Sequence, residues 1–149
     1  MAVERTFAML KPGVLQRRLA GEIIARIEKK GLSIVGMKIM RIRTELAERH
    51  YAEHAGKDFY LPLIAYMTSG PVVALAVEGQ DAVQALRALA GATNPLEAHA
   101  GTVRGDYGSR TQRNLIHASD SAASAARELT LFFADDEIHA WEDGNGLWL

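Results

Sequence analysis

Cysteine is absent from this sequence of 149 residues, which excludes disulfide bonds and thiolate metal sites. The 17 basic and 18 acidic residues leave a formal net charge of −1. This lack of a basic excess argues against a general nucleic-acid-binding protein. No uncharged stretch approaches the roughly 18 apolar residues that a membrane helix needs. The start, MAVERTFAML, is charged at Glu4 and Arg5 and is not a signal peptide. These absences predict a cytoplasmic protein without a membrane partner.

The composition is that of an ordinary globular chain, with 48% hydrophobic and 23% charged residues. The length suits one domain with a sizeable core. No internal repeat, low-complexity tract or Gly/Ser linker divides the chain. We therefore predict a single domain over residues 1–149.

Short apolar runs alternate with helical patterns along the chain. The patterns predict strands over 5–10, 32–42, 71–77 and 114–117, and helices over 20–30, 44–55, 59–68, 81–90 and 121–133. The run 32–42 is apolar on both faces and indicates a central strand. Thr44 is expected to cap one helix, and Asp81 with Gln84 resembles a capping box at the start of another. Residues 92–113 are expected to form a long loop.

The order of these elements predicts an α+β fold. If the helical pair 44–68 is an insertion, the remainder reads β-α-β-β-α-β, the ferredoxin-like pattern of an antiparallel sheet with helices on one face. The inserted pair, a C-terminal helix and a tail are added to it. A doubly wound parallel sheet would need more strand–helix alternations than this chain provides.

The segment HYAEH at 50–54 matches H-x-x-E-H, the order found in inverted zinc peptidases. On a helix, His50 and His54 lie one turn apart and could share a zinc ion, with Glu53 as base. A catalytic zinc needs three protein ligands and a substrate cleft, which is demanding for a chain of this size. The alternative interpretation, a solvent-facing side of a helix, is favoured.

A second segment, RNLIHASDS at 113–121, places His117 at the end of an apolar run. It is followed by residues that cap helices, so the pattern predicts a side chain at the rim of a sheet. Hydroxyls at Ser119 and Ser121 and the carboxylate of Glu128 are available to it. A neutral imidazole with one nitrogen held by such a group offers the other as a nucleophile. A buried structural group and a metal ligand are the alternatives.

Basic residues gather before this histidine. Between Gly101 and His117 the chain carries three arginines, at 104, 110 and 113, against one aspartate. A glycine-rich, locally cationic loop of this kind is a plausible polyphosphate site. Arg87 lies at the edge of the apolar stripe of its helix, where its guanidinium can face a cleft.

Together these segments resemble the nucleoside diphosphate kinases. RNLIHASDS, with ATNPLEAHAGTVRGDYG ahead of it, carries the resemblance. ERTFAMLKP, GEIIARIEKKGLSIVGMK, HYAEH, YMTSGPVVALAVEG and AARELTLFF extend it over nearly the whole chain. The resemblance implies a cytoplasmic enzyme that transfers the terminal phosphoryl group of ATP or another nucleoside triphosphate to a nucleoside diphosphate. It also implies a ping-pong reaction through a phosphohistidine, with Mg²⁺ held mainly by the nucleotide phosphates rather than by protein ligands.

The resemblance assigns roles to ten residues. His117 is the phosphorylated nucleophile, and Glu128 and Ser119 orient its ring. Phe59 covers the base, and Tyr51 is its hydroxyl-bearing neighbour. The residues that grip phosphates and sugar hydroxyls are Lys11, Arg87, Thr93, Arg104 and Asn114.

The resemblance further implies a homo-oligomer. The tail ending Gly146-Leu147-Trp148-Leu149 favours a hexamer over a tetramer. Three positions depart from the family pattern: Gly13 replaces an aspartate, and Arg18 and Ala118 replace glycines. If position 118 needs a positive φ, alanine would cost on the order of 1 kcal/mol there. A single-stranded RNA-binding module with the same topology is the other alternative, although the strands lack the aromatic pattern that it requires.

Overall fold

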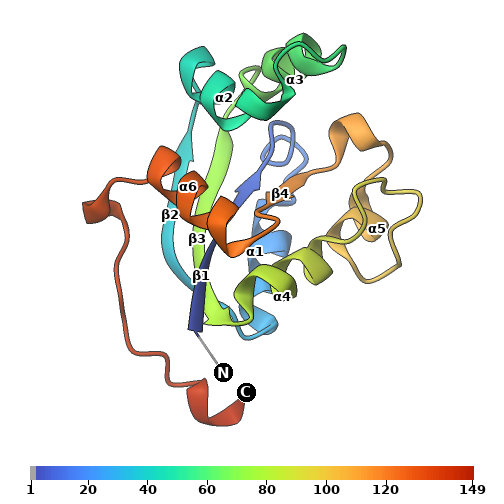
Figure 1. The fold of residues 1–149 in the computed structure, drawn as a ribbon. Coiled ribbons are helices and arrows are strands. Elements are labelled where there is room, and N and C mark those ends of the chain that lie inside the picture. Colours follow the sequence, from blue (N-terminus) through green and yellow to red (C-terminus); the bar gives the residue numbers. More distant parts are fainter. Residues whose placement is uncertain (1–2) are drawn as a thin grey trace.

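The computed structural model describes residues 3–149 and places four strands and six α-helices in them (Figure 1). The strands are β1 (Val3–Leu10), β2 (Ser33–Met40), β3 (Val72–Gln80) and β4 (Ile116–Ala118). The helices are α1 (Ala20–Lys29), α2 (Thr44–His50), α3 (Tyr60–Met67), α4 (Ala82–Ala90), α5 (Val103–Tyr107) and α6 (Ala122–Phe132). Short 3₁₀ turns occupy 52–54, 111–113, 135–137 and 146–148. No helix within 3–149 combines the length and the apolar character needed to cross a membrane.

The four strands form one antiparallel sheet in the order β2-β3-β1-β4. This order confirms the predicted ferredoxin-like α+β fold. Of the two central strands, β1 pairs with β3 along its whole length, from Val3↔Gln80 to Leu10↔Val73. The short strand β4 pairs with the end of β1, which sets His117 opposite Met9. The last residues of β1 and the histidine therefore meet at one end of the sheet.

The sheet is covered on both faces because its side chains alternate. Ala8 and Leu10 of β1 pack with α1 and α4, the two helices of the β-α-β-β-α-β unit, on one face as predicted. Phe7 and Met9 point the other way and pack with α2, α3 and α6. The inserted helices and the C-terminal helix thus supply the second layer, which the sequence pattern left unplaced.

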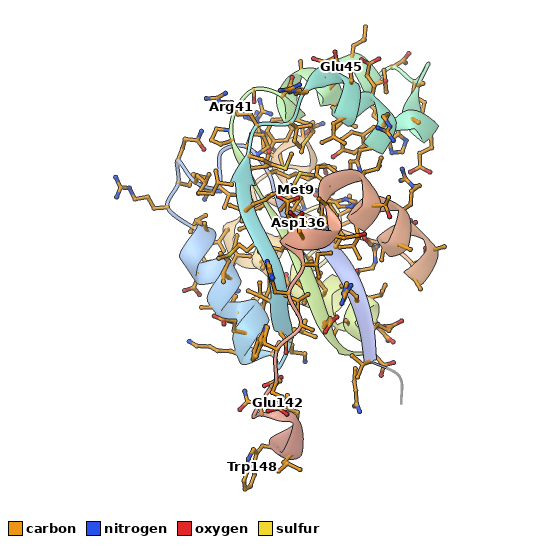
Figure 2. All side chains as sticks on the ribbon, turned by 90° about the vertical axis from the view of Figure 1, so that its left-hand side faces the viewer. Met9, Arg41, Glu45, Asp136, Glu142 and Trp148 are labelled. Atoms are coloured by element: carbon orange, nitrogen blue, oxygen red, sulfur yellow. The ribbon has the colours of Figure 1, made fainter. Side chains whose placement is uncertain are left out.

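One strand prediction was wrong: β2 is an edge strand, not a central one. Figure 2 views the molecule from the β2 side. Met37 and Ile39 of this strand are 58% and 67% exposed. The error has a simple cause, because apolar side chains report on the two faces of a strand and carry no information about how many neighbours pair with its backbone.

Two predicted caps were also wrong. Asp81 precedes α4 in a left-handed conformation (φ 49°), and within the described residues its side chain makes no capping hydrogen bond. Glu4 of β1 acts instead, because its carboxylate accepts from the backbone N–H of Val83 at 3.3 Å. Thr44 is the first helical residue rather than the cap, and its helix ends at His50 instead of 55.

The region around β4 differs from the expectation in detail. The expected loop 92–113 contains the short helix α5. Ala118 lies in β4, paired with Ala8, so the strain expected for a positive φ does not arise there. Positive φ occurs instead at Arg18 (57°) and at Leu115 (74°), two residues before His117. The polar residues after His117 cap the next helix as predicted: the Ser121 hydroxyl accepts from the Ser124 N–H at 3.1 Å, and the helix begins at Ala122 rather than at residue 121.

Candidate active site

A cavity of about 1000 Å³ opens beside the end of β1 and β4. Its walls come from the α2–α3 region on one side and from residues 110–114 on the other. Six of the ten predicted site residues line it: Lys11, Tyr51, Phe59, Thr93, Asn114 and His117. Residues that are separated by more than 100 positions in the chain therefore face one space.

His117 is held by a buried carboxylate. Its Nε2 lies 2.6 Å from Glu128 Oε1, a residue on α6 that is only 4% exposed. The Ser119 hydroxyl donates to the same oxygen at 2.7 Å. A neutral His117 with its proton on Nε2 donates to Glu128 and leaves Nδ1 with a free lone pair. The predicted grouping of these three residues is thus present, and it selects one ring nitrogen for chemistry.

The Glu128 carboxylate is charged in this setting. Burial by itself raises the pKa of a carboxyl group, but the hydrogen bond and charge of His117, together with the hydrogen bond from Ser119, outweigh burial, so the pKa of Glu128 lies below its ordinary value. A charged acceptor forms stronger hydrogen bonds than a neutral one. Glu128 is therefore suited to stabilise a His117 ring that gains positive charge.

Asn114 connects two sides of the cavity. Its Oδ1 accepts from Lys11 Nζ at 2.7 Å, and its Nδ2 donates to the carbonyl of Thr93 at 3.0 Å. Burial, followed by the charge of Arg104, lowers the pKa of Lys11 to about 7. A lysine that loses its hydration without gaining a carboxylate partner favours a bound anion.

Arg104 and Arg87 lie behind this wall rather than on it. The buried Arg104 guanidinium donates to the carbonyls of Asn114, Gly91 and Ile116 at 3.2, 2.8 and 2.6 Å. Burial and then the charge of Arg87 lower the pKa of Arg104 to about 10. Arg87 donates to the Ala118 carbonyl at 3.3 Å and borders a separate groove beside α4. In this structure both side chains brace the segment that carries the histidine.

Two arginines of the cationic loop, Arg110 and Arg113, do line the cavity. The Arg113 guanidinium lies over the Tyr66 ring, 4.2 Å from its centroid. The Tyr66 hydroxyl donates to the Pro12 carbonyl at 3.0 Å, which joins α3 to the end of β1. Tyr66 carries no sequence signal of a site residue, because its position one turn after Leu63 in an apolar helix is typical of a core residue.

The mouth of the cavity carries an exposed ring. Phe59 is 50% exposed, unusual for phenylalanine, and precedes α3. The His54 ring meets it edge-on with centroids 5.2 Å apart, and Lys57 Nζ lies 5.7 Å from its centroid. Tyr51 lies deeper, and burial raises its pKa well above the ordinary value, so its hydroxyl stays protonated.

The zinc-peptidase interpretation of HYAEH was wrong. Glu53 is 75% exposed and lies 3.8 Å from His54, whereas His50 is buried. Within 3–149 the group that could hold a metal is a different one, His50 with His117 and Glu128. The favoured alternative, a solvent-facing helix side, was also wrong for His50, which is only 3% exposed.

Comparisons with known proteins agree on one family. The family model described as "Nucleoside diphosphate kinase" matches residues 4–138. Curated proteins named nucleoside diphosphate kinase include one from Archaeoglobus fulgidus, 56% identical over 147 residues, which cover 99% of this chain and 97% of the relative. Another, from Pelotomaculum thermopropionicum, is 58% identical over 136 residues, 91% of each chain.

Solved structures give the same result for the fold. The halophilic nucleoside diphosphate kinase from Halobacterium salinarum, in complex with CDP, superposes with a TM-score of 0.96 at 49% identity, covering 99% of this chain and 98% of that one. A nucleoside diphosphate kinase family protein from Babesia bovis gives 0.94 at 41% identity, with 97% and 98% covered. With the family model matching most of the sequence and these relatives matching almost all of it, the chain belongs to the nucleoside diphosphate kinase family, whose activity is that of a phosphotransferase acting on nucleotides.

Proposed function

We propose that this chain performs its phosphotransfer in two half-reactions through a phosphohistidine at Nδ1 of His117. In the first, the Nδ1 lone pair attacks the terminal phosphorus of a nucleoside triphosphate, the bond to the bridging oxygen breaks, and the diphosphate leaves. In the second, a terminal oxygen of another diphosphate attacks the same phosphorus, and the P–N bond breaks. The observation that supports this proposal is the 2.6 Å contact of His117 Nε2 with Glu128, which leaves Nδ1 as the nucleophile.

The cavity wall suits phosphate oxygens. Phosphoryl transfer needs positioning and charge neutralisation more than covalent work by the protein. Lys11 and Asn114 supply a cation and an amide beside His117, and Arg110 and Arg113 add positive charge along the same wall. We propose that Arg87 and Arg104 support the site by hydrogen-bonding to backbone carbonyls of the segment that carries His117. The relative solved with CDP supports a nucleoside diphosphate as the ligand of this space.

Phe59 provides a platform for the base. Its exposed ring offers a π-face, and stacking on a π-face is tolerant of base identity. We therefore expect every common nucleoside diphosphate to be an acceptor, with modest differences in KM. Tyr51 and Thr93 line the same cavity as Phe59 and His117, and we propose that they contact the sugar.

Mg²⁺ fits this site as a companion of the nucleotide rather than as a resident ion. Magnesium prefers octahedral oxygen ligands and usually binds through substrate phosphates. In the described part of the chain, the one group of three potential metal-binding side chains offers two imidazoles and one carboxylate, largely buried. When bound on the phosphates, Mg²⁺ neutralises charge that Lys11 and the arginines leave uncompensated.

Three further expectations complete the proposal. We propose that residues 1–149 act as one domain, because a single sheet carries both cores. A homo-oligomer, with the hexamer favoured, is supported by the tail, where Leu147, Trp148 and Leu149 are 91%, 84% and 71% exposed. Figure 2 shows Trp148 at the far end of that tail, away from the sheet. Light scattering with and without residues 146–149 tests whether the chain forms this homo-oligomer.

A cytoplasmic location, implied by the resemblance, stays a prediction.

A two-step incubation tests the phosphohistidine. The protein is mixed with γ-labelled ATP and Mg²⁺, freed of nucleotide, and then given GDP. We expect label that is acid-labile and alkali-stable, and that passes to GDP. His117→Ala should abolish labelling, while His99→Ala, which changes an exposed histidine outside the cavity, should label normally. Labelling that survives in His117→Ala would refute the mechanism.

A further inference from the structure

His50 is a buried polar residue that the mechanism does not use. It ends α2, and its side chain is 3% exposed. Within residues 3–149 neither Nδ1 nor Nε2 has a hydrogen-bond partner. Unpartnered nitrogens in a buried site cost free energy that a phenylalanine of similar size would not incur. The presence of an imidazole there therefore points to a use other than stability.

The His50 ring packs directly against the nucleophile. Its centroid is 4.8 Å from that of His117, and the two planes are nearly perpendicular at 84°. On its other sides it meets Tyr51 at 4.4 Å and Phe132 at 5.2 Å, again edge to face. Tyr51 directly follows α2 and Phe132 ends α6, two of the helices that form the second layer. His50 is thus wedged between that layer and the reactive ring.

His117 needs such a contact because its single hydrogen bond to Glu128 does not define its orientation. The hydrogen bond from Nε2 fixes the position of one ring atom, but by itself it does not fix the orientation of the ring plane. Phe7 touches the ring at a tilt, with centroids 5.9 Å apart and planes at 51°. His50 adds a perpendicular wall, and two walls together with one hydrogen bond define the plane.

We propose that His50 is a positioning residue for His117: its neutral ring sets the plane of the nucleophile and presents an unpartnered nitrogen to it as positive charge develops. This proposal rests on the proposed function, since it concerns the same phosphohistidine. A His117 ring that carries a phosphoryl group on Nδ1 and a proton on Nε2 is cationic. The His50, His117 and Glu128 donor atoms lie within 4.8 Å of one another, so a His50 lone pair is near that charge.

The neighbours of His50 keep it neutral. Burial, followed by the charge of His117, lowers the pKa of His50 to about 3. Arg127 and Lys11 act in the same direction, and Glu128 acts against them. A neutral imidazole does not repel a phosphohistidine ring, and it leaves Glu128 to serve His117 alone.

Two substitutions separate the parts of this role. His50→Phe keeps a ring at the same place but removes the nitrogens, and His50→Ala removes both. The proposal requires the order wild type, His50→Phe, His50→Ala in the single-turnover rate of His117 phosphorylation. We expect about a tenfold loss for the first and about a hundredfold loss for the second, as misplacement of a reacting group typically causes. KM for nucleotide should stay within about twofold, because His50 lies outside the cavity lining.

A second readout reports orientation directly. Phosphorus NMR distinguishes a phosphoryl group on Nδ1 from one on Nε2. Wild type and His50→Phe should give Nδ1 alone. His50→Ala should give a mixture, since the space left by the His50 ring lets the His117 ring flip and release Nε2 from Glu128. Phe133→Leu is the matched control, because Phe133 belongs to the same core and its ring centroid lies 6.4 Å from that of Phe7. It should lower the melting temperature and leave both rate and isomer unchanged.

The outcomes are decisive in each case. Any other order of rates, a single isomer in His50→Ala, or an equal rate loss in Phe133→Leu overturns the positioning role. If His50→Ala does not fold, the rate of His50→Phe against wild type and Phe133→Leu still decides. The proposed function fails separately, through label retained by His117→Ala. If that variant is unlabelled while the His50 variants match wild type, the inference alone is wrong.

Discussion

Replacement of Glu128 by glutamine tests how much the buried carboxylate contributes to transfer. In the structure Glu128 Oε1 accepts from both His117 Nε2 and Ser119 Oγ, at 2.6 and 2.7 Å. The amide oxygen of a glutamine can accept from both donors, so the change removes the charge and keeps the shape. The hydrogen bond from Ser119 is the same before and during transfer. The bond from His117 strengthens as its ring becomes cationic, so it sets the effect on rate.

The magnitude follows from the difference between charged and neutral hydrogen bonds. Bonds to charged groups contribute about 1.5–3 kcal/mol and neutral ones about 0.5–1.5 kcal/mol, so the loss in the transition state is about 1–2 kcal/mol. At 1.36 kcal/mol per factor of ten, Glu128→Gln should slow phosphorylation of His117 by about 5- to 30-fold. Glu128→Ala should slow it further, because it leaves the His117 and Ser119 donors unpaired in a buried site.

Quenched-flow labelling with γ-labelled ATP measures this rate, and titration with ADP measures binding. We expect unchanged ADP affinity, because Glu128 lies behind His117 rather than in the cavity lining. Glu137→Gln is a matched control: it makes the same chemical change in a carboxylate that pairs with Lys38 at 2.8 Å, far along the C-terminal segment. A Glu128→Gln enzyme that phosphorylates His117 within twofold of wild type would refute the reasoning.

Three further predictions follow from single side chains. Because the pKa of Lys11 is lowered to about 7, its amine is increasingly neutral above pH 7, and a bound polyphosphate favours the ammonium form. ADP binding at pH 8–9 should therefore take up a proton and weaken as pH rises, and calorimetry in buffers of different ionisation enthalpy should show no such uptake for Lys11→Met. Arg18 holds a φ of 57°, so Arg18→Gly should stabilise the fold by roughly 0.5–1 kcal/mol after the entropy of the unfolded glycine is subtracted; urea denaturation with a lower midpoint would contradict this. His54→Ala removes the edge contact that supports Phe59, worth about 0.5–1.5 kcal/mol, and should raise KM about 2- to 12-fold with kcat unchanged. A fall in kcat would show that His54 acts on the chemistry.

Local patterns in the sequence determined a large part of this protein. Apolar runs along β1 and β3 and helical spacing in α1, α4 and α6 follow from short-range burial, and they sufficed for the order of elements and the ferredoxin-like sheet. The segment around His117 could be interpreted from the sequence because its site residues are also close together along the chain. About a dozen residues of sequence contain the end of the strand, the hydroxyl of Ser119 and, in the helix that follows, the carboxylate of Glu128.

Tertiary structure decided which distant residues meet. β2 became an edge strand because pairing depends on the other strands and not on its own apolar side chains. Arg104 is predicted to grip phosphate, and only the fold shows that three carbonyl groups accept from its guanidinium. His50 was predicted to lie on a solvent-facing helix side. In the structure α2 packs over the sheet, and His50 contacts the ring of His117. In each case the deciding contact joins residues from different elements of the fold. Helical and strand periodicity reports only on residues within one element, so the contact can be found only in the folded structure.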